Sequence, residues 1–308
     1  MNTYAFSKAK NLTRLAAVVS LAALVLIPAM RTAMAQSQAT PSVQPASMAT
    51  PAIDRMPSNG AWTYNFADLV DGPLPRADWN FEVGTKVASN NSEEQAYTAR
   101  TNNVRVENGT LVIEAQPETM DGKQYTSARI DTHGKFDFDY GTLEVDMMLP
   151  PGVGTWPAAW LMPAENAYDP QHYGIAKTDP YAWVLNGEID FAEEVGRIPG
   201  QNIPAAHSYN SRTSGVSQYT PAYVPNPYGA YHRYGIIKTP DKLTFTLDGR
   251  PYATRVRTGD SVLDWPFNQR YYLILNLAIG GTWAGDDGID NASAPWLLKV
   301  RSISYQPL

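Results

Sequence analysis

Short runs in which apolar and polar residues alternate recur along most of this chain, and turn residues separate them. Val104 to Ala115 alternates on both sides of Asn108-Gly109, a dipeptide that favours a two-residue β-hairpin turn. Leu243 to Tyr252 repeats this arrangement around Asp248-Gly249. Because a strand turns successive side chains to opposite faces, each run predicts a strand with one buried face.

Three further runs extend the pattern towards the C-terminus. Gly141 to Leu149 and Val300 to Tyr305 alternate, whereas Tyr271 to Ile279 is nearly all apolar, as expected for a strand buried on both faces. Glycine and proline are frequent between the runs, and no long amphipathic helix stands out. Evenly spaced strands with turn punctuation predict an all-β fold, an antiparallel β-sandwich of two sheets.

The N-terminal region has the composition of an export signal. Lys8, Lys10 and Arg14 precede the apolar run Leu15 to Met30, and Ala33-Met34-Ala35 matches a cleavage site. We therefore expect a signal peptide at residues 1–35, a flexible leader rich in Pro, Ser and Ala at 36–58, and a single domain at 59–308. The mature protein is then secreted or periplasmic, without a membrane anchor.

Composition excludes several classes of function. The chain has no cysteine, so disulfides, thiolate metal sites and a cysteine nucleophile are excluded. Removal of the signal, which carries four basic residues and no acid, takes the formal charge from −6 to −10. Such a negative chain is a poor candidate for binding nucleic acid or anionic membranes. We expect a monomer without a cofactor.

The most chemically informative stretch is Glu188-Ile189-Asp190-Phe191-Ala192-Glu193, with three carboxylates in six residues. Strand alternation turns Glu188 and Asp190 to the same face and Glu193 to the other. A β-bulge at Phe191-Ala192 would bring all three onto one face. A glycosidase needs such crowding, because it uses one ionised and one protonated carboxyl group.

Other interpretations of the same acids remain open. They could be the solvated face of an edge strand, or calcium ligands, or a chance pattern. We expect the next residue, Glu194, to face away from Glu193 and to be solvated.

Aromatic residues lie close to the acidic stretch in the sequence. Sugar rings present apolar faces that stack on indole, so Trp156, Trp160, Trp183 and Trp283 are candidates for the floor of a sugar-binding groove. Core packing is the alternative for each of them, and for Trp160 the two are evenly balanced. The Gly- and Pro-rich surroundings of Trp183 and Trp283 favour exposed loops.

Longer segments resemble a known family. GTWPAAWLMP followed by NGEIDFAEEVG is similar to the laminarinases, the endo-β-1,3-glucanases of glycoside hydrolase family 16. The resemblance extends to NNSEEQAYTARTNNVRVENGTLVIEA, to YTSARIDTHGKFDFDYGTLEVDMMLPPG and to WPFNQRYYLILNLAIGGTWAG, and it covers roughly residues 61 to 308.

The resemblance implies a concanavalin-like jelly roll with an open substrate cleft on its concave sheet, and a retaining mechanism. Glu188 would be the nucleophile, Glu193 the general acid/base, and Asp190 the group between them that tunes both. The positions that match substrate-binding residues of the family are Asn91, Arg129, Trp156, Trp160, Trp183, His207, Asn276 and Trp283. For Arg129 a buried ion pair, and for His207 a structural role, are the alternatives.

Some features depart from the family pattern. The segment between Pro163 and Trp183 is longer than usual and could build an extra wall beside the cleft. The acidic residues expected at a structural calcium site are replaced by Asn65 and Arg301, so we expect no calcium there.

Substrate and activity have several possible assignments. The first is a secreted endo-glucanase acting on laminarin-type β-1,3-glucan or on mixed β-1,3/1,4-glucan. The six-position acidic spacing resembles that of laminarinases more than that of lichenases. An agar or galactan hydrolase and a transglycosylase of the same family are alternatives. A non-catalytic glucan-binding sandwich is a third class, although it predicts loss of at least one acid.

Overall fold

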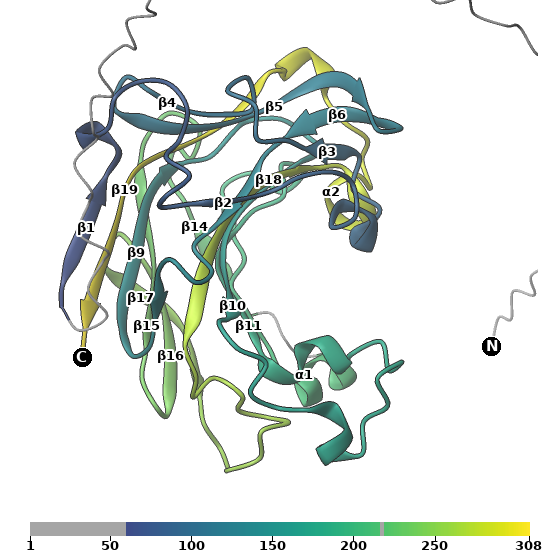
Figure 1. The fold of residues 1–308 in the computed structure, drawn as a ribbon, viewed down its shortest axis with the longest axis vertical. Coiled ribbons are helices and arrows are strands. Elements are labelled where there is room, and N and C mark those ends of the chain that lie inside the picture. The colour runs from purple at the N-terminus through teal and green to yellow at the C-terminus, as the bar shows by residue number, and fades with distance from the viewer. Residues whose placement is uncertain (1–59, 216–218) are drawn as a thin grey trace, which may run out of the picture. The chain divides into compact units, whose positions relative to one another are not determined.

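The computed structural model describes residues 60–215 and 219–308, and the predicted signal peptide and the whole of the predicted leader lie outside them. Within the described part, nearly all regular structure is β, in two large sheets and one small one. Figure 1 shows the two large sheets as the layers of a sandwich, with the smaller one curved. The predicted all-β sandwich is confirmed.

The larger sheet has ten strands among the described residues. Its hydrogen-bonded order is β17 (Arg250–Val256), β16 (Lys242–Leu247), β15 (His232–Lys238), β9 (Gly141–Met148), β19 (Trp296–Pro307), β5 (Thr110–Met120), β6 (Lys123–Ser127) and β3 (Gln95–Tyr97), with β1 (Trp62–Asn65) beside β19 and β4 (Val104–Glu107) beside β5. The pairs are antiparallel except β3 and β6.

The smaller sheet has seven strands in the same part of the chain. Its order is β13 (Ala205–His207), β11 (Glu188–Glu193), β10 (Thr155–Pro163), β18 (Tyr271–Ile279), β7 (Arg129–Asp131) and β2 (Asn80–Glu82), with β8 (Asp137–Phe138) beside β18. A separate two-stranded sheet joins β12 (Gln201–Asn202) to β14 (Ala222–Tyr223).

Helices are short throughout the described residues. The α-helices are α1 (Tyr209–Ser214) and α2 (Gly281–Ala284), and the 3₁₀ helices are η1 (Phe66–Asp68), η2 (Ala88–Asn91), η3 (Pro170–Tyr173), η4 (Ala182–Asn186) and η5 (Asn291–Ser293). No helix in these ranges has the length and apolar character needed to cross a membrane.

The core lies between the two large sheets and follows from strand alternation. Leu143, Val145 and Met147 of β9 are fully buried, while the residues between them are partly exposed. They belong to one apolar cluster with Leu161 and Leu275 of the smaller sheet. Fully burying each such side chain contributes roughly 1.5–3 kcal/mol, so this interface holds the layers together.

The two predicted hairpins are confirmed. Asn108 and Gly109 adopt φ of 51° and 70° between β4 and β5, and Asp248 and Gly249 adopt 52° and 74° between β16 and β17. Positive φ at both central residues is the requirement of a type I′ turn. The runs predicted at 141–149, 271–279 and 300–305 form β9, β18 and the second half of β19.

The smaller sheet turns one face to the core and leaves the other free. In Figure 1 this free face lies on the inside of the curve, with α1 at one end of it and α2 at the other. Helix η2 lies beside α2, because Glu93 forms a β-bridge with Gly280. The free face therefore has a rim at each end.

The positions at which a family calcium would be expected make protein contacts. Asn65 donates from Nδ2 to Asp68 Oδ2 over 3.3 Å. Arg301 contacts Asp146 Oδ2 through Nε at 2.9 Å and through Nη2 at 2.8 Å. A guanidinium group thus balances the charge of Asp146.

Candidate active site

The acidic stretch forms β11, and its bulge lies where the sequence predicts it. Asp190 pairs with Trp160 and Ala192 pairs with Ala159, which leaves Phe191 as the extra residue. Ile189, Phe191 and Ala192 are fully buried in the core cluster. Two consecutive residues thus face the core, and Glu193 returns to the face of Glu188 and Asp190. The predicted convergence of the three acids is confirmed.

The turn that leads into β11 requires a glycine. Gly187 has φ of 83°, and a Cβ at this position would approach the hydroxyl of Tyr271 to 2.5 Å. This hydroxyl also donates to the carbonyl of Asn186 over 2.8 Å. The close approach fixes where Glu188 begins the strand.

His207 lies next to two of the acids. It pairs with Glu188 across β13 and β11, and its Nε2 is 3.6 Å from Glu188 Oε1 and 3.1 Å from Asp190 Oδ2. Its side chain is 11% exposed. Strand pairing therefore places His207 beside the acids, so it is not only a structural residue of the core.

Burial dominates the electrostatics of the cluster. Burial and, after it, the charge of Asp190 raise the pKa of Glu188 to about 8. Burial also raises the pKa of Asp190 and of Glu193, and Asp190 adds to the effect on Glu193. Burial lowers the pKa of His207 and so favours the neutral imidazole. Because like charges so close cannot all ionise, the cluster retains protons at neutral pH.

Two tryptophans lie at the Glu193 end of the free face. Trp156 donates from Nε1 to Glu193 Oε1 over 2.9 Å, and its ring meets that of Trp283 edge-on at 5.3 Å. Arg197 holds the backbone of Trp283 by donating to its carbonyl over 2.8 Å. Trp283 lies in α2 and not in the predicted loop. Both indoles are partly exposed, which favours contact with a ligand.

A second group crosses the free face from β10 to β2. Trp160 donates from Nε1 to Asn276 Oδ1 over 2.8 Å, and Arg129 stacks on its ring at 4.7 Å. Arg129 also forms an ion pair with Glu82 at 2.7 Å. Trp160 therefore lies on the free face and not in the core. The ion pair considered as an alternative role for Arg129 is present, and it lies on the same face.

Asn91 joins this group through a buried carboxylate. It donates from Nδ2 to Glu93 Oε1 over 3.1 Å, and Gln95 donates to Glu93 Oε2 over 2.6 Å. Tyr97 lies between Glu93 and Asn276, with its hydroxyl 3.4 Å and 3.2 Å from the two side chains. The network connects the η2 rim to the strands of the free face.

Trp183 lies at the opposite rim. It is 47% exposed and belongs to η4, so the predicted loop is a 3₁₀ turn. The segment before it contacts α1, because Tyr209 donates to Asp179 Oδ2 over 3.1 Å and Arg212 lies 5.8 Å from the Tyr181 ring. The long segment therefore builds this rim together with α1.

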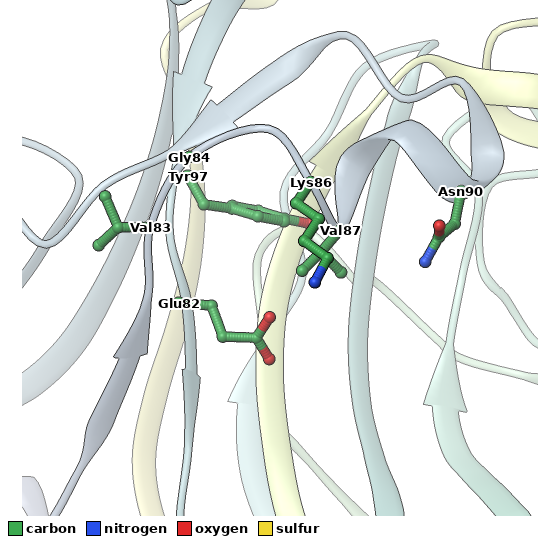
Figure 2. A pocket seen from close by; sticks show the side chains of 7 residues that line it. All are labelled: Glu82, Val83, Gly84, Lys86, Val87, Asn90 and Tyr97. Atoms are coloured by element: carbon green, nitrogen blue, oxygen red, sulfur yellow. The ribbon is translucent and has the colours of Figure 1, made fainter. Parts of the chain in front are cut away.

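A pocket of about 380 Å³ opens beside the Arg129 end of the free face. Glu82, Lys86 and Asn90 are among the side chains that line it, as Figure 2 shows. Glu82 is the partner of Arg129, so the pocket adjoins the Trp160 group. Its lining mixes the polar side chains of Glu82, Lys86 and Asn90 with Val83 and Val87.

Glu194 corrects an expectation. It is 1% exposed and not solvated, and its Oε1 accepts a hydrogen bond from the Tyr228 hydroxyl over 2.8 Å. Burial raises its pKa to about 7. Strand alternation turns it away from Glu193, as predicted, but Tyr228, which lies 34 residues further along the chain, covers it.

Sequence reasoning did not single out Glu82, Lys86, Glu93 or Tyr97. A signal for two of them was present, because Glu93 alternates with Gln95 and Tyr97 of β3 along the chain. Glu82 and Lys86 have no comparable pattern, and only the pairing of β2 with β7 brings Glu82 to Arg129.

Comparison with known proteins identifies the family. The family model described as Glycosyl hydrolases family 16 matches residues 91–296. The chain belongs to glycosyl hydrolases family 16. Membership makes it a glycoside hydrolase with a jelly-roll fold, as the resemblance in its sequence implies.

Individual relatives are similar to this protein along most of its chain. A "Beta-glucanase" from Rhodothermus marinus is 37% identical over 260 residues, which cover 81% of this chain and 87% of the relative. A "Glucan endo-1,3-beta-glucosidase" from Cryptopygus antarcticus is 32% identical and covers 80% and 92% of the two chains. The solved laminarinase from Rhodothermus marinus aligns with a TM-score of 0.72 at 34% identity, over 80% of this chain and 96% of the other.

Proposed function

We propose that this family 16 enzyme is a retaining endo-glycosidase that hydrolyses laminarin-type β-1,3-glucan or mixed β-1,3/1,4-glucan. The observation that carries it is the bulge in β11, which brings Glu188, Asp190 and Glu193 to one partly exposed face. The names of the β-glucanase and endo-1,3-β-glucosidase relatives support the substrate class.

In the first step Glu193 acts as the acid and Glu188 as the nucleophile. Glu193 gives its proton to the glycosidic oxygen while Glu188 attacks the anomeric carbon. The bond to the leaving sugar breaks, and an ester to Glu188 forms. Retained protons in the buried cluster keep an acid available near neutral pH.

In the second step Glu193 is the base. It takes a proton from water, the resulting hydroxide attacks the anomeric carbon, and the ester to Glu188 breaks with the configuration restored. Asp190 lies between Glu188 and Glu193 and raises the pKa of both. The protonation state of one glutamate therefore depends on the charge of the other.

The aromatic and polar side chains of the free face would hold the polymer. Trp160, Trp156 and Trp283 present indole rings to the apolar faces of sugars, while Asn91, Asn276 and Arg129 offer polar groups to hydroxyls. Trp183 would contact the chain from the other rim. No cofactor takes part in these steps.

We also propose that the enzyme acts as a secreted or periplasmic monomer. The export signal read from the first 35 residues supports this location. Mass analysis of the protein from its host would find an N-terminus at Gln36, and a retained leader would contradict the proposal.

The test is product analysis with purified protein on laminarin, lichenan, curdlan and agarose. We expect oligosaccharides from laminarin with the β-configuration at the new reducing end in early NMR spectra. Products with the α-configuration would refute the retaining mechanism. Products from agarose alone would move the enzyme to galactans, and products longer than the substrate would indicate transglycosylation.

Two variants separate chemistry from folding. Glu188→Gln removes the nucleophile with little change in size, so turnover is lost while binding to the polymer persists. Glu165→Gln, at an exposed position after β10, is the matched control and retains turnover. Loss of binding together with turnover in Glu188→Gln would mean that Glu188 is structural.

A further inference from the structure

Three side chains of the free face form a potential metal-ligand set. Glu188, Asp190 and His207 each present one ligand atom, and these atoms all lie within 4.8 Å of one another. They come from neighbouring strands, since Glu188 pairs with His207 and Asp190 with Ala205. Strand pairing in the fully folded sheet therefore holds the set together.

Two of the three distances within the set are close to the edges of a small coordination sphere. A tetrahedral zinc ion with ligands at about 2.0–2.2 Å requires its ligand atoms to lie about 3.3–3.6 Å apart. His207 Nε2 lies 3.1 Å from Asp190 Oδ2 and 3.6 Å from Glu188 Oε1. Two of the three separations are therefore close to this range, and the third, between the Glu188 and Asp190 oxygens, is no more than 4.8 Å. Movement of the two carboxylates towards one another would complete the set.

The short contact between His207 and Asp190 is not a formed hydrogen bond. Asp190 Oδ2 is buried and has no hydrogen-bond partner, although Nε2 of His207 is close to it. Asp190 is 5% exposed. A buried carboxylate oxygen without a donor leaves an unmet interaction, and a cation bound between the two side chains would satisfy it.

An ion could reach this position from solvent. The side chain of Glu188 is 15% exposed, and that of His207 is 11% exposed. Glu193 is not part of the set, since its Oε1 accepts the Trp156 N–H. Three protein ligands would leave the fourth position of a tetrahedral ion open to water.

We propose that Glu188, Asp190 and His207 form an inhibitory binding site for a divalent transition-metal ion, with zinc as the best fit. Inhibition, but not binding, rests on the proposed role of Glu188 as nucleophile. Coordination uses the carboxylate oxygen that would attack the anomeric carbon, and the bound ion occupies the space of the sugar. Metal and substrate therefore compete.

The donor set also predicts which ions bind. An imidazole with two carboxylates suits zinc, copper and nickel, whereas magnesium and calcium prefer oxygen ligands alone and more of them. His207 Nδ1 has no hydrogen-bond partner to orient the ring. Since loss of such a partner costs about 10–100-fold in affinity, zinc binding is weaker here than at a supported site.

The experiment titrates the purified full-length protein with ZnCl₂ by calorimetry, and separately with MgCl₂. We expect one zinc ion to bind per chain and no magnesium to bind at this site. Zinc should inhibit laminarin hydrolysis by raising KM while kcat is unchanged, and EDTA should reverse the inhibition. Cobalt(II) would give the visible absorption of a four-coordinate ion.

Variants assign the site. His207→Ala and Asp190→Asn should weaken zinc binding by more than about 100-fold, because each loses a ligand and not merely an outer partner. His172→Ala, at an exposed position on η3, is the matched control and should bind as the parent does. Thermal unfolding checks that each variant is folded.

Several results would overturn the inference. These are unchanged zinc binding in a folded His207→Ala or Asp190→Asn protein, loss of binding in His172→Ala, or noncompetitive inhibition or activation by zinc in the parent. If both site variants fail to fold, the cobalt spectrum of the parent decides. A six-coordinate spectrum would overturn the inference, and a four-coordinate spectrum that is lost when laminarin oligosaccharides displace the ion would support it. Failure of the proposed function would give a different result. The metal-free protein would then not hydrolyse laminarin, but it would still bind zinc.

Discussion

Glu194→Gln tests how strongly burial acts on the acids of this fold. Glu194 is 1% exposed, and its Oε1 accepts a hydrogen bond from the Tyr228 hydroxyl. Burial raises its pKa from 4.5 to about 7. A raised pKa means that the folded state favours the protonated form. The associated stability is present below pH 4.5 and is lost as the pH rises through about 7.

The size of the effect follows from the shift. With 1.36 kcal/mol for each pKa unit, a shift from 4.5 to about 7 corresponds to about 3 kcal/mol. A glutamine side chain keeps an oxygen that can accept a hydrogen bond from the Tyr228 hydroxyl, but it cannot ionise. The parent should therefore lose about 3 kcal/mol more than Glu194→Gln between about pH 4 and about pH 9. The other buried acids titrate in both proteins and cancel.

The assay is urea unfolding of the parent, Glu194→Gln and the exposed control Glu165→Gln across this pH range, with free energies from linear extrapolation. We expect the control to follow the parent and Glu194→Gln to lose less stability as the pH rises. Parallel curves for the parent and Glu194→Gln would refute the reasoning, because they would mean that Glu194 titrates alike in the folded and unfolded states.

The remaining predictions concern the free face. Trp156→Phe removes the N–H that lowers the pKa of Glu193, so the alkaline limb of kcat/KM should move up by as much as about one pH unit, and an unmoved limb would contradict the contact. Glu193→Ala should be rescued by azide with a β-glycosyl azide as product, since azide needs no base, and absence of rescue would argue against an acid/base role. Trp283→Ala should raise KM more on long glucans than on short ones, and a KM unchanged from that of the parent would exclude a sugar contact.

Much of the site followed from rules that act within a few residues. Alternation along a strand, with one extra residue at Phe191, was enough to predict that Glu188, Asp190 and Glu193 share a face. The two hairpins followed from dipeptides that tolerate positive φ, at Asn108-Gly109 and at Asp248-Gly249. Both kinds of feature are local, so neighbouring residues contain the information.

Other features depended on contacts between distant segments. Alternation pointed Glu194 away from Glu193 correctly, yet its burial comes from Tyr228 and could not be predicted from its neighbours. Glu82 meets Arg129 only because β2 pairs with β7. The surroundings of Trp283 likewise depend on Arg197, which lies 86 residues earlier in the chain.

By itself the amino-acid order determined the strands, the turns and the face on which the three acids lie, because side-chain direction and turn geometry are set by adjacent residues. Tertiary structure alone decided which groups surround those acids and how far their pKa values move. Desolvation sums over atoms from every strand that packs nearby, and the partner of each residue across the sheet depends on hydrogen-bond register between segments far apart in the chain.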